Sequence, residues 1–199
     1  MIRPVLVWGT KGTCCSMLIW IIKKLTDPDY FVSNPVDESF AAHLQPMPFH
    51  WYGEQDLASF IAQSNTPPLE QIYHCEPNDQ TWSQAEGYKN IVIYASTVVE
   101  LRQIAIFQRY KNPVSDTYTV NDLFRNLAIN TKHVKLEMPG ALNLRLSEVN
   151  TANIAPTLDQ LCDYLGIDHS GNYSDIINVH NHWYQGNKNL VDQHIHKLL

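Results

Sequence analysis

The residues with the clearest chemical potential form a glycine loop near the N-terminus. Residues 9–16 read Gly-Thr-Lys-Gly-Thr-Cys-Cys-Ser and combine two glycines, a lysine and three hydroxyl groups. Such a loop, placed between a strand and a helix, presents backbone N–H groups and the positive end of a helix dipole, which together bind anions, most often phosphate. The loop therefore predicts a site for a small anion. The alternative is a tight turn without a ligand, in which Thr13 caps the following helix.

The position of the lysine limits which phosphate chemistry this loop supports. In the loops that bind ATP or GTP, a lysine and a Ser or Thr stand six and seven positions after the first glycine. Counted from Gly9, these positions hold Cys15 and Ser16, and the lysine is Lys11, inside the loop. Kinase and NTPase chemistry is disfavoured, because it needs a lysine at the helix start and a carboxylate that holds Mg²⁺.

Two adjacent cysteines at the end of this loop allow a second hypothesis. A thiol at a helix N-terminus beside a lysine has a lowered pKa, so Cys14 or Cys15 could act as a nucleophile or redox sensor. The alternative is that both are small residues packed under the loop. The four cysteines of the chain contain no Cys-x-x-Cys pair, so neither a structural zinc site nor a disulfide scaffold is expected.

Histidine is the residue best suited to move a proton near neutral pH, and the chain has nine. His74 stands at the end of a predicted strand and is one candidate for this role, with His50 and His43 as others. Near the C-terminus, His180 and His182 are two residues apart. On a helix these side chains point in different directions, so we expect exposed histidines and no metal site.

Composition describes the molecule that carries these residues. The chain has 199 residues, of which 44% are hydrophobic and 17% charged, with a net charge of −6. This predicts one folded domain over residues 1–199 and excludes disorder and a membrane span. Because 14 Lys and Arg oppose 20 Asp and Glu, a general nucleic-acid binder is disfavoured. The N-terminal apolar run is too short for a signal peptide, so a cytoplasmic location is expected.

Apolar runs and helical patterns alternate along the chain. Strands are predicted at 2–8, 69–74, 90–95, 134–138 and 141–146, and helices at 14–25, 54–62, 98–110, 120–129 and 154–165. Asn121 is a predicted cap, Pro156 lies in a first turn, and Gly166 is a predicted C-cap. One or two terminal helices are expected to dock on the sheet through Trp183, Tyr184, Leu190, Val191 and Ile195. This alternation predicts an α/β fold with a mostly parallel central sheet and helices on both faces.

Four short segments in this order resemble the P-loop sulfotransferases, which use 3′-phosphoadenosine 5′-phosphosulfate. Residues 10–14 are similar to their first loop, and residues 70–74 end in a histidine, as does the strand that carries the general base of the cytosolic members. Residues 91–96 are similar to the strand whose end binds the 3′-phosphate. Residues 146–149, followed by 158–167, are similar to a Tyr-Glu-Asp-Leu segment and a helix that ends Phe-Leu-Gly.

The resemblance implies a three-layer P-loop-type fold and a function. A sulfuryl group would pass from 3′-phosphoadenosine 5′-phosphosulfate, a co-substrate, to a hydroxyl or amine of a small-molecule or glycan acceptor, with no metal. Lys11 would stabilise the leaving phosphate, and His74, ahead of His50 and His43, would accept the proton. The implied nucleotide-binding residues are Gly9, Thr10, Lys11, Gly12, Thr13, Cys14, Ser16, Ser96 and Arg102.

This sequence departs from the family pattern at two strand ends. Ala95 or Ser96 stands where the family has its phosphate-binding arginine, and Ile72 stands where the cytosolic members have lysine. Arg102 and Arg109, from the following helix, can replace the missing charge. The alternative is a degenerate P-loop module that binds a nucleotide or a partner without catalysis, which the absent arginine favours.

Overall fold

The chain folds into an α/β structure, as the alternation of strands and helices predicts. The computed structural model describes residues 4–10, 12–30, 50–51, 56–63, 71–76, 82–111, 118–129, 138–168 and 173–198. Its strands are β1 (Val5–Trp8), β2 (His50–Trp51), β3 (Ile72–Cys75), β4 (Lys89–Tyr94) and β5 (Leu142–Arg145). Its α-helices are α1 (Cys15–Thr26), α3 (Leu57–Gln63), α4 (Val98–Tyr110), α5 (Val120–Ile129), α6 (Leu146–Val149), α7 (Ala155–Leu165) and α8 (Ser174–His194).

The sheet has the order β2-β3-β1-β4-β5, and every neighbouring pair of strands is parallel. The three central strands are mainly apolar and are buried on both faces, which is the pattern of parallel strands covered by helices. The predicted strand at 141–146 becomes β5, but Leu146 already begins α6. The predicted strand at 134–138 lies mainly outside the described residues.

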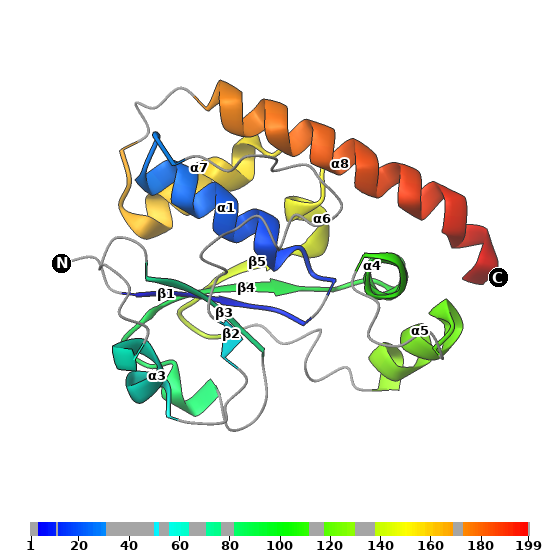
Figure 1. Ribbon diagram of the computed structural model, residues 1–199, viewed down its shortest axis with the longest axis horizontal. Helices are drawn as coiled ribbons and strands as arrows, with labels where there is room; N and C mark the ends of the chain where they lie inside the picture. Colours follow the sequence, from blue (N-terminus) through cyan, green and yellow to red (C-terminus); the bar gives the residue numbers. More distant parts are fainter. Residues whose placement is uncertain are drawn as a thin grey trace.

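Helices cover both faces of this sheet, as predicted. Figure 1 shows α1, α7 and α8 above the sheet and α3 below it. On the α1 side the core contains one set of alternate strand residues, including Val5, Val7 and Ile91. On the α3 side it contains the other set, including Leu6 and Trp8, together with Leu57 of α3. The α1 helix is buried over nearly its whole surface, because it lies between the sheet and α8.

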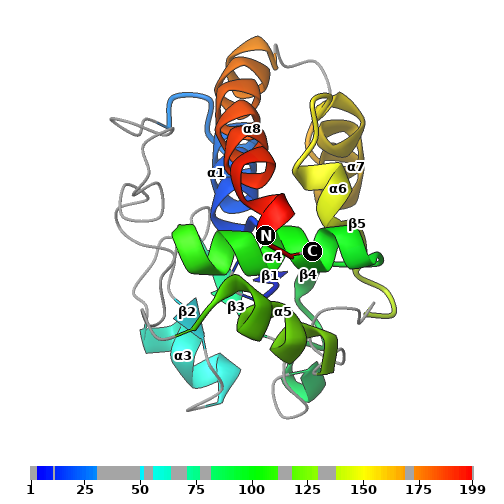
Figure 2. The ribbon, with the colours of Figure 1, turned by 90° about the vertical axis from the view of Figure 1, so that its right-hand side faces the viewer.

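The helix α4 crosses the carboxyl end of the sheet. Figures 1 and 2 show it perpendicular to the strands, with α5 packed beneath it. The chain leaves β1 toward β2 on one side of the sheet and leaves β4 toward β5 on the other. Because β1 and β4 are neighbours, their outgoing loops diverge at this edge, which is where open parallel sheets bind ligands. The loops that follow β1 and β4 therefore lie at the end of the sheet where such ligands bind.

Two helix ends agree with the sequence, and one differs from it. Pro156 lies in the first turn of α7, and Gly166 ends that helix in the left-handed conformation with φ 73°. Asn121, the predicted cap, is instead the second residue of α5. Thr119 takes that place: its hydroxyl accepts from Asp122 N–H at 3.2 Å, and its own N–H donates to the Asp122 carboxylate at 3.0 Å.

The terminal helix also corrects an expectation. A single long helix, α8, packs against α1 and α4 rather than directly on the sheet. His180 is fully buried, although the histidines of this region were expected to be exposed. Its Nε2 lies 2.7 Å from the carbonyl oxygen of Val149, so this ring fastens α8 to α6. No helix in the described residues is long and apolar enough to cross a membrane.

Candidate functional site

The β1–α1 loop is a tight turn that continues the sheet. Gly9 N–H donates to the carbonyl of Cys75 on β3 at 3.1 Å. Within the loop, both the N–H and the hydroxyl of Thr13 donate to the carbonyl of Thr10, at 3.1 and 2.7 Å. The hydroxyl of Thr13 is therefore used inside the turn and does not cap α1, which corrects that expectation. Lys11, the predicted leaving-group cation, lies outside the described residues.

The two glycines of this loop are required by close approaches. A Cβ atom on Gly9 would lie 2.3 Å from Oγ1 of Thr13 and 2.6 Å from Sγ of Cys15. Gly12 has φ +87°, a conformation that favours glycine, and a Cβ there would lie 2.9 Å from the carbonyl oxygen of Ile104. The loop is thus folded tightly on itself and pressed against the middle of α4.

The N-terminus of α1 has an unusual cap. Cys14 occupies the N-cap position in the left-handed conformation, with φ 68°, and its side chain makes no capping hydrogen bond. Ser16 follows in the first turn of the helix. An N-terminus without a side-chain acceptor keeps its positive dipole and N–H groups available, which is the physical basis of anion binding. The anion site at this helix end stays a prediction.

The two cysteines do not have the low thiol pKa that the sequence suggested. Burial raises the pKa of Cys14 to about 12, although the nearby Lys111 ammonium opposes the change. Burial also raises the pKa of Cys15 to about 12, and the thiol of Cys15 contacts the hydroxyl of Thr13 at 3.3 Å. Both thiols therefore stay protonated at neutral pH, and thiol catalysis is not supported. The cysteines pack under the loop instead.

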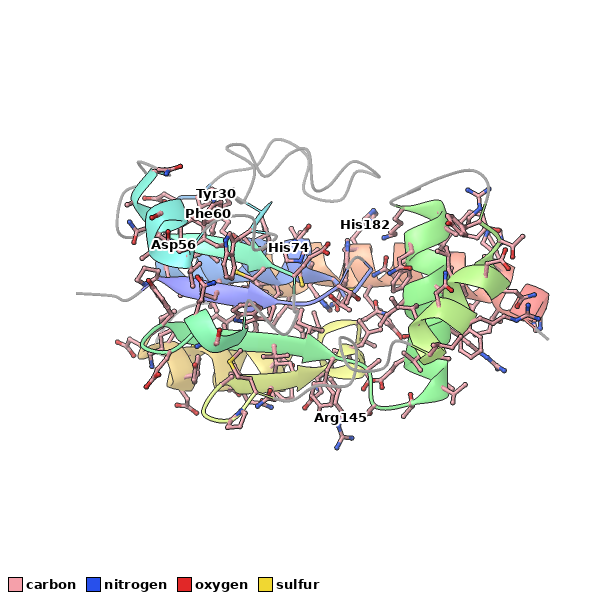
Figure 3. All side chains as sticks on the ribbon, turned by 90° about the horizontal axis from the view of Figure 1, so that it is seen from below. Tyr30, Asp56, Phe60, His74, Arg145 and His182 are labelled. Carbon is pink, nitrogen blue, oxygen red and sulfur yellow. The ribbon has the colours of Figure 1, made fainter. Side chains whose placement is uncertain are left out.

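His74 is the predicted site residue that the structure brings to the loop. It lies on β3 and is 5% exposed, and its Nε2 is 2.9 Å from the carbonyl oxygen of Gly9. Because a carbonyl oxygen only accepts, Nε2 carries the hydrogen of this bond, and a second proton on the ring would lie on Nδ1, which is itself buried. Figure 3 shows His74 within the sheet layer, whereas Arg145 projects outward from β5.

The β4–α4 loop has a very different polar arrangement, centred on Glu100. Oε2 of Glu100 accepts from the N–H groups of Ser96 and Thr97 at 2.7 and 3.0 Å, and from their hydroxyls at 3.0 and 3.1 Å. Oε1 accepts from the N–H of Ser147 at 3.0 Å, at the start of α6. In return, the hydroxyl of Thr97 accepts from Glu100 N–H at 3.2 Å, which completes a capping box.

This carboxylate is buried but charged. The Glu100 side chain is 4% exposed. Burial raises its pKa, but the hydrogen bonds from Ser147 and Ser96 outweigh burial and leave the pKa below its ordinary value. Both donors of Ser96, the predicted phosphate-binding residue, are therefore directed to an anion that belongs to the protein itself.

Arg102 lies on a different face of α4 from the residue that contacts the β1–α1 loop. It is two residues from Ile104, which touches Gly12, so the two side chains lie about 160° apart around the helix. The guanidinium of Arg102 instead lies 5.7 Å from the ring of Phe124 on α5. In this position the guanidinium packs on α5, and its role as a substitute for the strand-end arginine stays a prediction.

Lys111 is a cation near the loop that the sequence reasoning missed. Its ammonium donates to Oδ1 of Asn187 on α8, and Asn187 donates in turn to Asn150 at 2.9 Å. The ring of Trp183 lies 5.4 Å from the same ammonium. The spacing of Ile104, Gln108 and Lys111 was the available signal, because residues i, i+4 and i+7 share one helix face.

The described part of the chain contains no group of three or more His, Cys, Asp or Glu side chains able to hold a metal ion. His180 is buried against Val149, whereas His182 is exposed on another face of α8 (Figure 3). These two residues do not converge on a common point.

Comparison with known proteins gives no family for the chain. No family model matches it, and no curated protein matches it at significant similarity.

Proposed function

We propose that the protein is a sulfotransferase-like enzyme that binds an adenosine phosphosulfate at the β1–α1 loop. The donor that the resemblance implies is 3′-phosphoadenosine 5′-phosphosulfate, and the acceptor is a hydroxyl or amine of a small molecule or glycan. The observation that carries the proposal is the position of His74, whose Nε2 lies 2.9 Å from the carbonyl of the first loop residue, Gly9. A buried proton acceptor thus adjoins a loop that leads to a helix N-terminus without a side-chain cap.

The reaction assigns a task to each of these groups. The bond between sulfur and the bridging oxygen breaks, and this oxygen stays with the 5′-phosphate. A new bond forms between sulfur and the acceptor atom, whose proton passes to the imidazole of His74. The N-terminus of α1 and Lys11 stabilise the charge that collects on the phosphate. The hydrogen bond to Gly9 holds the imidazole ring in place throughout.

A second candidate is a nucleotide-binding module without catalysis. It is favoured by the β4–α4 loop, where Glu100 takes the donors of Ser96 that the resemblance assigns to the 3′-phosphate. The two candidates share the β1–α1 loop as the binding site. They differ in whether transfer follows binding.

Calorimetry tests the shared binding site. We expect adenosine 5′-monophosphate and adenosine 3′,5′-bisphosphate to bind the wild-type protein with micromolar dissociation constants. Lys11→Ala should weaken both about tenfold or more, because it removes a cation at the 5′-phosphate. Lys188→Ala is the matched control, since that lysine is half-exposed on α8 and paired with Asp192. The absence of binding heat at high micromolar ligand would exclude both candidates.

A second experiment separates the sulfotransferase-like enzyme from the non-catalytic module. His74→Gln keeps an amide donor near the carbonyl of Gly9 but removes the proton acceptor. We expect it to bind the nucleotides as the wild type does and to lose transfer to phenol, sugar and amine acceptors by a factor on the order of 10² or more. Binding without transfer by the wild type would leave the non-catalytic module. Equal transfer by His74→Gln would remove His74 from the mechanism.

A further inference from the structure

The β4–α4 loop has the donor set of an anion site, but its anion is already present. Four groups of Ser96 and Thr97 converge on one oxygen of Glu100, and Ser147 N–H binds the other. Three of these five donors are backbone N–H groups at the starts of two helices, α4 and α6. This is how proteins hold phosphate and sulfate, except that here a buried side chain occupies the position.

The consequence concerns the nucleotide that the molecule recognises. A phosphate group presented to this loop meets a carboxylate that is 4% exposed, and it finds both donors of Ser96 already engaged. Arg102, the cation nearest in sequence, lies over Phe124 on α5. A phosphate therefore meets like charge at the place where the resemblance puts the 3′-phosphate.

We infer that Glu100 is an internal substitute for the 3′-phosphate, so that the protein recognises nucleotides by their 5′ end and does not select for a 3′-phosphate. The donor class is then a nucleoside 5′-phosphosulfate, with or without the 3′-phosphate. This inference rests on the proposed function, because it presumes that a nucleotide occupies the β1–α1 loop. It assigns to Glu100 the role of a specificity-determining residue.

The ratio of two affinities tests the inference. In the wild type, adenosine 5′-monophosphate and adenosine 3′,5′-bisphosphate should bind within about threefold of each other, or the monophosphate should bind more tightly. Ser96→Ala should leave this ratio unchanged, because Ser96 is engaged by Glu100 rather than by ligand. Since Ser96 is exposed, we expect this variant to keep the fold.

The opposite affinity ratios would overturn the inference about Glu100. A preference of tenfold or more for the bisphosphate in the wild type, or a selective loss of bisphosphate affinity in Ser96→Ala, would show that Ser96 binds the 3′-phosphate. If neither nucleotide binds, the proposed function fails and this inference falls with it. A failure of the inference alone appears as tight binding with the reverse preference, so the two failures are distinguishable.

Removal of the carboxylate gives a positive test. In Glu100→Ala the five donors become available, so we expect the affinity for the bisphosphate to rise at least fivefold while that for the monophosphate stays unchanged. Circular dichroism and a thermal melt establish that this variant is folded, and Glu100→Gln serves if it is not. An unchanged ratio in a folded variant would contradict the role assigned to Glu100.

Discussion

Two loops at the same edge of the sheet lead from neighbouring strands into helices, and they treat the helix N-terminus in opposite ways. After β4, Thr97 and Glu100 form a capping box, and the Glu100 carboxylate also binds Ser96 and Ser147. After β1, the cap residue is Cys14 in the left-handed conformation, and its side chain accepts no hydrogen bond from α1.

The difference shows where an external anion is useful. The dipole and N–H groups of α4 are already neutralised by a buried carboxylate, so an added anion there gains little and meets repulsion. At the start of α1 neither Cys14 nor Thr13 neutralises the helix end, because the Thr13 hydroxyl is bound to Thr10. The first loop is the one suited to a ligand, and the second is part of the structural frame.

Among the substitutions that test this difference between the two loops, Glu100→Ala should have the largest effect on stability. Loss of a buried carboxylate leaves Ser147 N–H and the donors of the β4–α4 loop without their acceptor, which should lower the free energy of unfolding by about 2–4 kcal/mol. Denaturant titration measures this value. Glu100→Gln, which keeps the size but not the charge, should lose less. If Glu100→Ala were as stable as the wild type, the carboxylate would not hold α4 and α6 together.

The charge of Glu100 also predicts a dependence on pH. Its folded-state pKa lies below the ordinary value of 4.5, so its contribution is complete above about pH 5 and is lost as the pH falls through the folded pKa. The difference in unfolding free energy between the wild type and Glu100→Gln should therefore be constant from pH 5 to 8 and shrink below pH 4.5. A difference that grows on acidification would contradict a depressed pKa.

The sequence predicts most of the strands and helices, but fewer of the contacts at the candidate site. The apolar runs of β1 and β4, the helical periods of α4 and α5 and the Pro156 and Gly166 signals identify their elements, because burial and chain geometry are local properties. His74, which the sequence offers as a general base, lies beside the first loop.

The parts that were missed depend on contacts between distant segments. Nothing in the sequence points to the bond between Glu100 and Ser147, because this bond depends on how β5 meets α6. Lys111 meets Asn187 only because α8 packs against α4. The cysteine pKa was predicted from the helix N-terminus and the lysine, but burial, which the sequence does not display, dominates it.

Gly12→Ala probes the fit of the first loop against α4. The new Cβ would lie 2.9 Å from the carbonyl oxygen of Ile104, in a backbone with φ +87°, so we expect a loss of about 2–3 kcal/mol. Gly87→Ala is a matched control, because Gly87 has the same φ and no heavy atom within 4 Å of the added Cβ. Its loss should be about 1 kcal/mol, the cost of the left-handed conformation alone. Equal losses would mean that the loop yields to the added methyl group.

The smallest losses of stability are expected at two helix caps that have the same hydrogen-bond pattern. Thr97 pairs with the buried Glu100, and Thr119 forms the same reciprocal pair with Asp122, which is only partly buried. Thr97→Ala should lower the free energy of unfolding by about 1–2 kcal/mol, and Thr119→Ala by about 0.5–1 kcal/mol. Water replaces the lost partner more easily at the start of α5 than beside a buried carboxylate. Equal losses in urea titrations would mean that the β4–α4 loop is an ordinary helix cap, and the contrast with the β1–α1 loop would then rest on the Glu100 carboxylate alone.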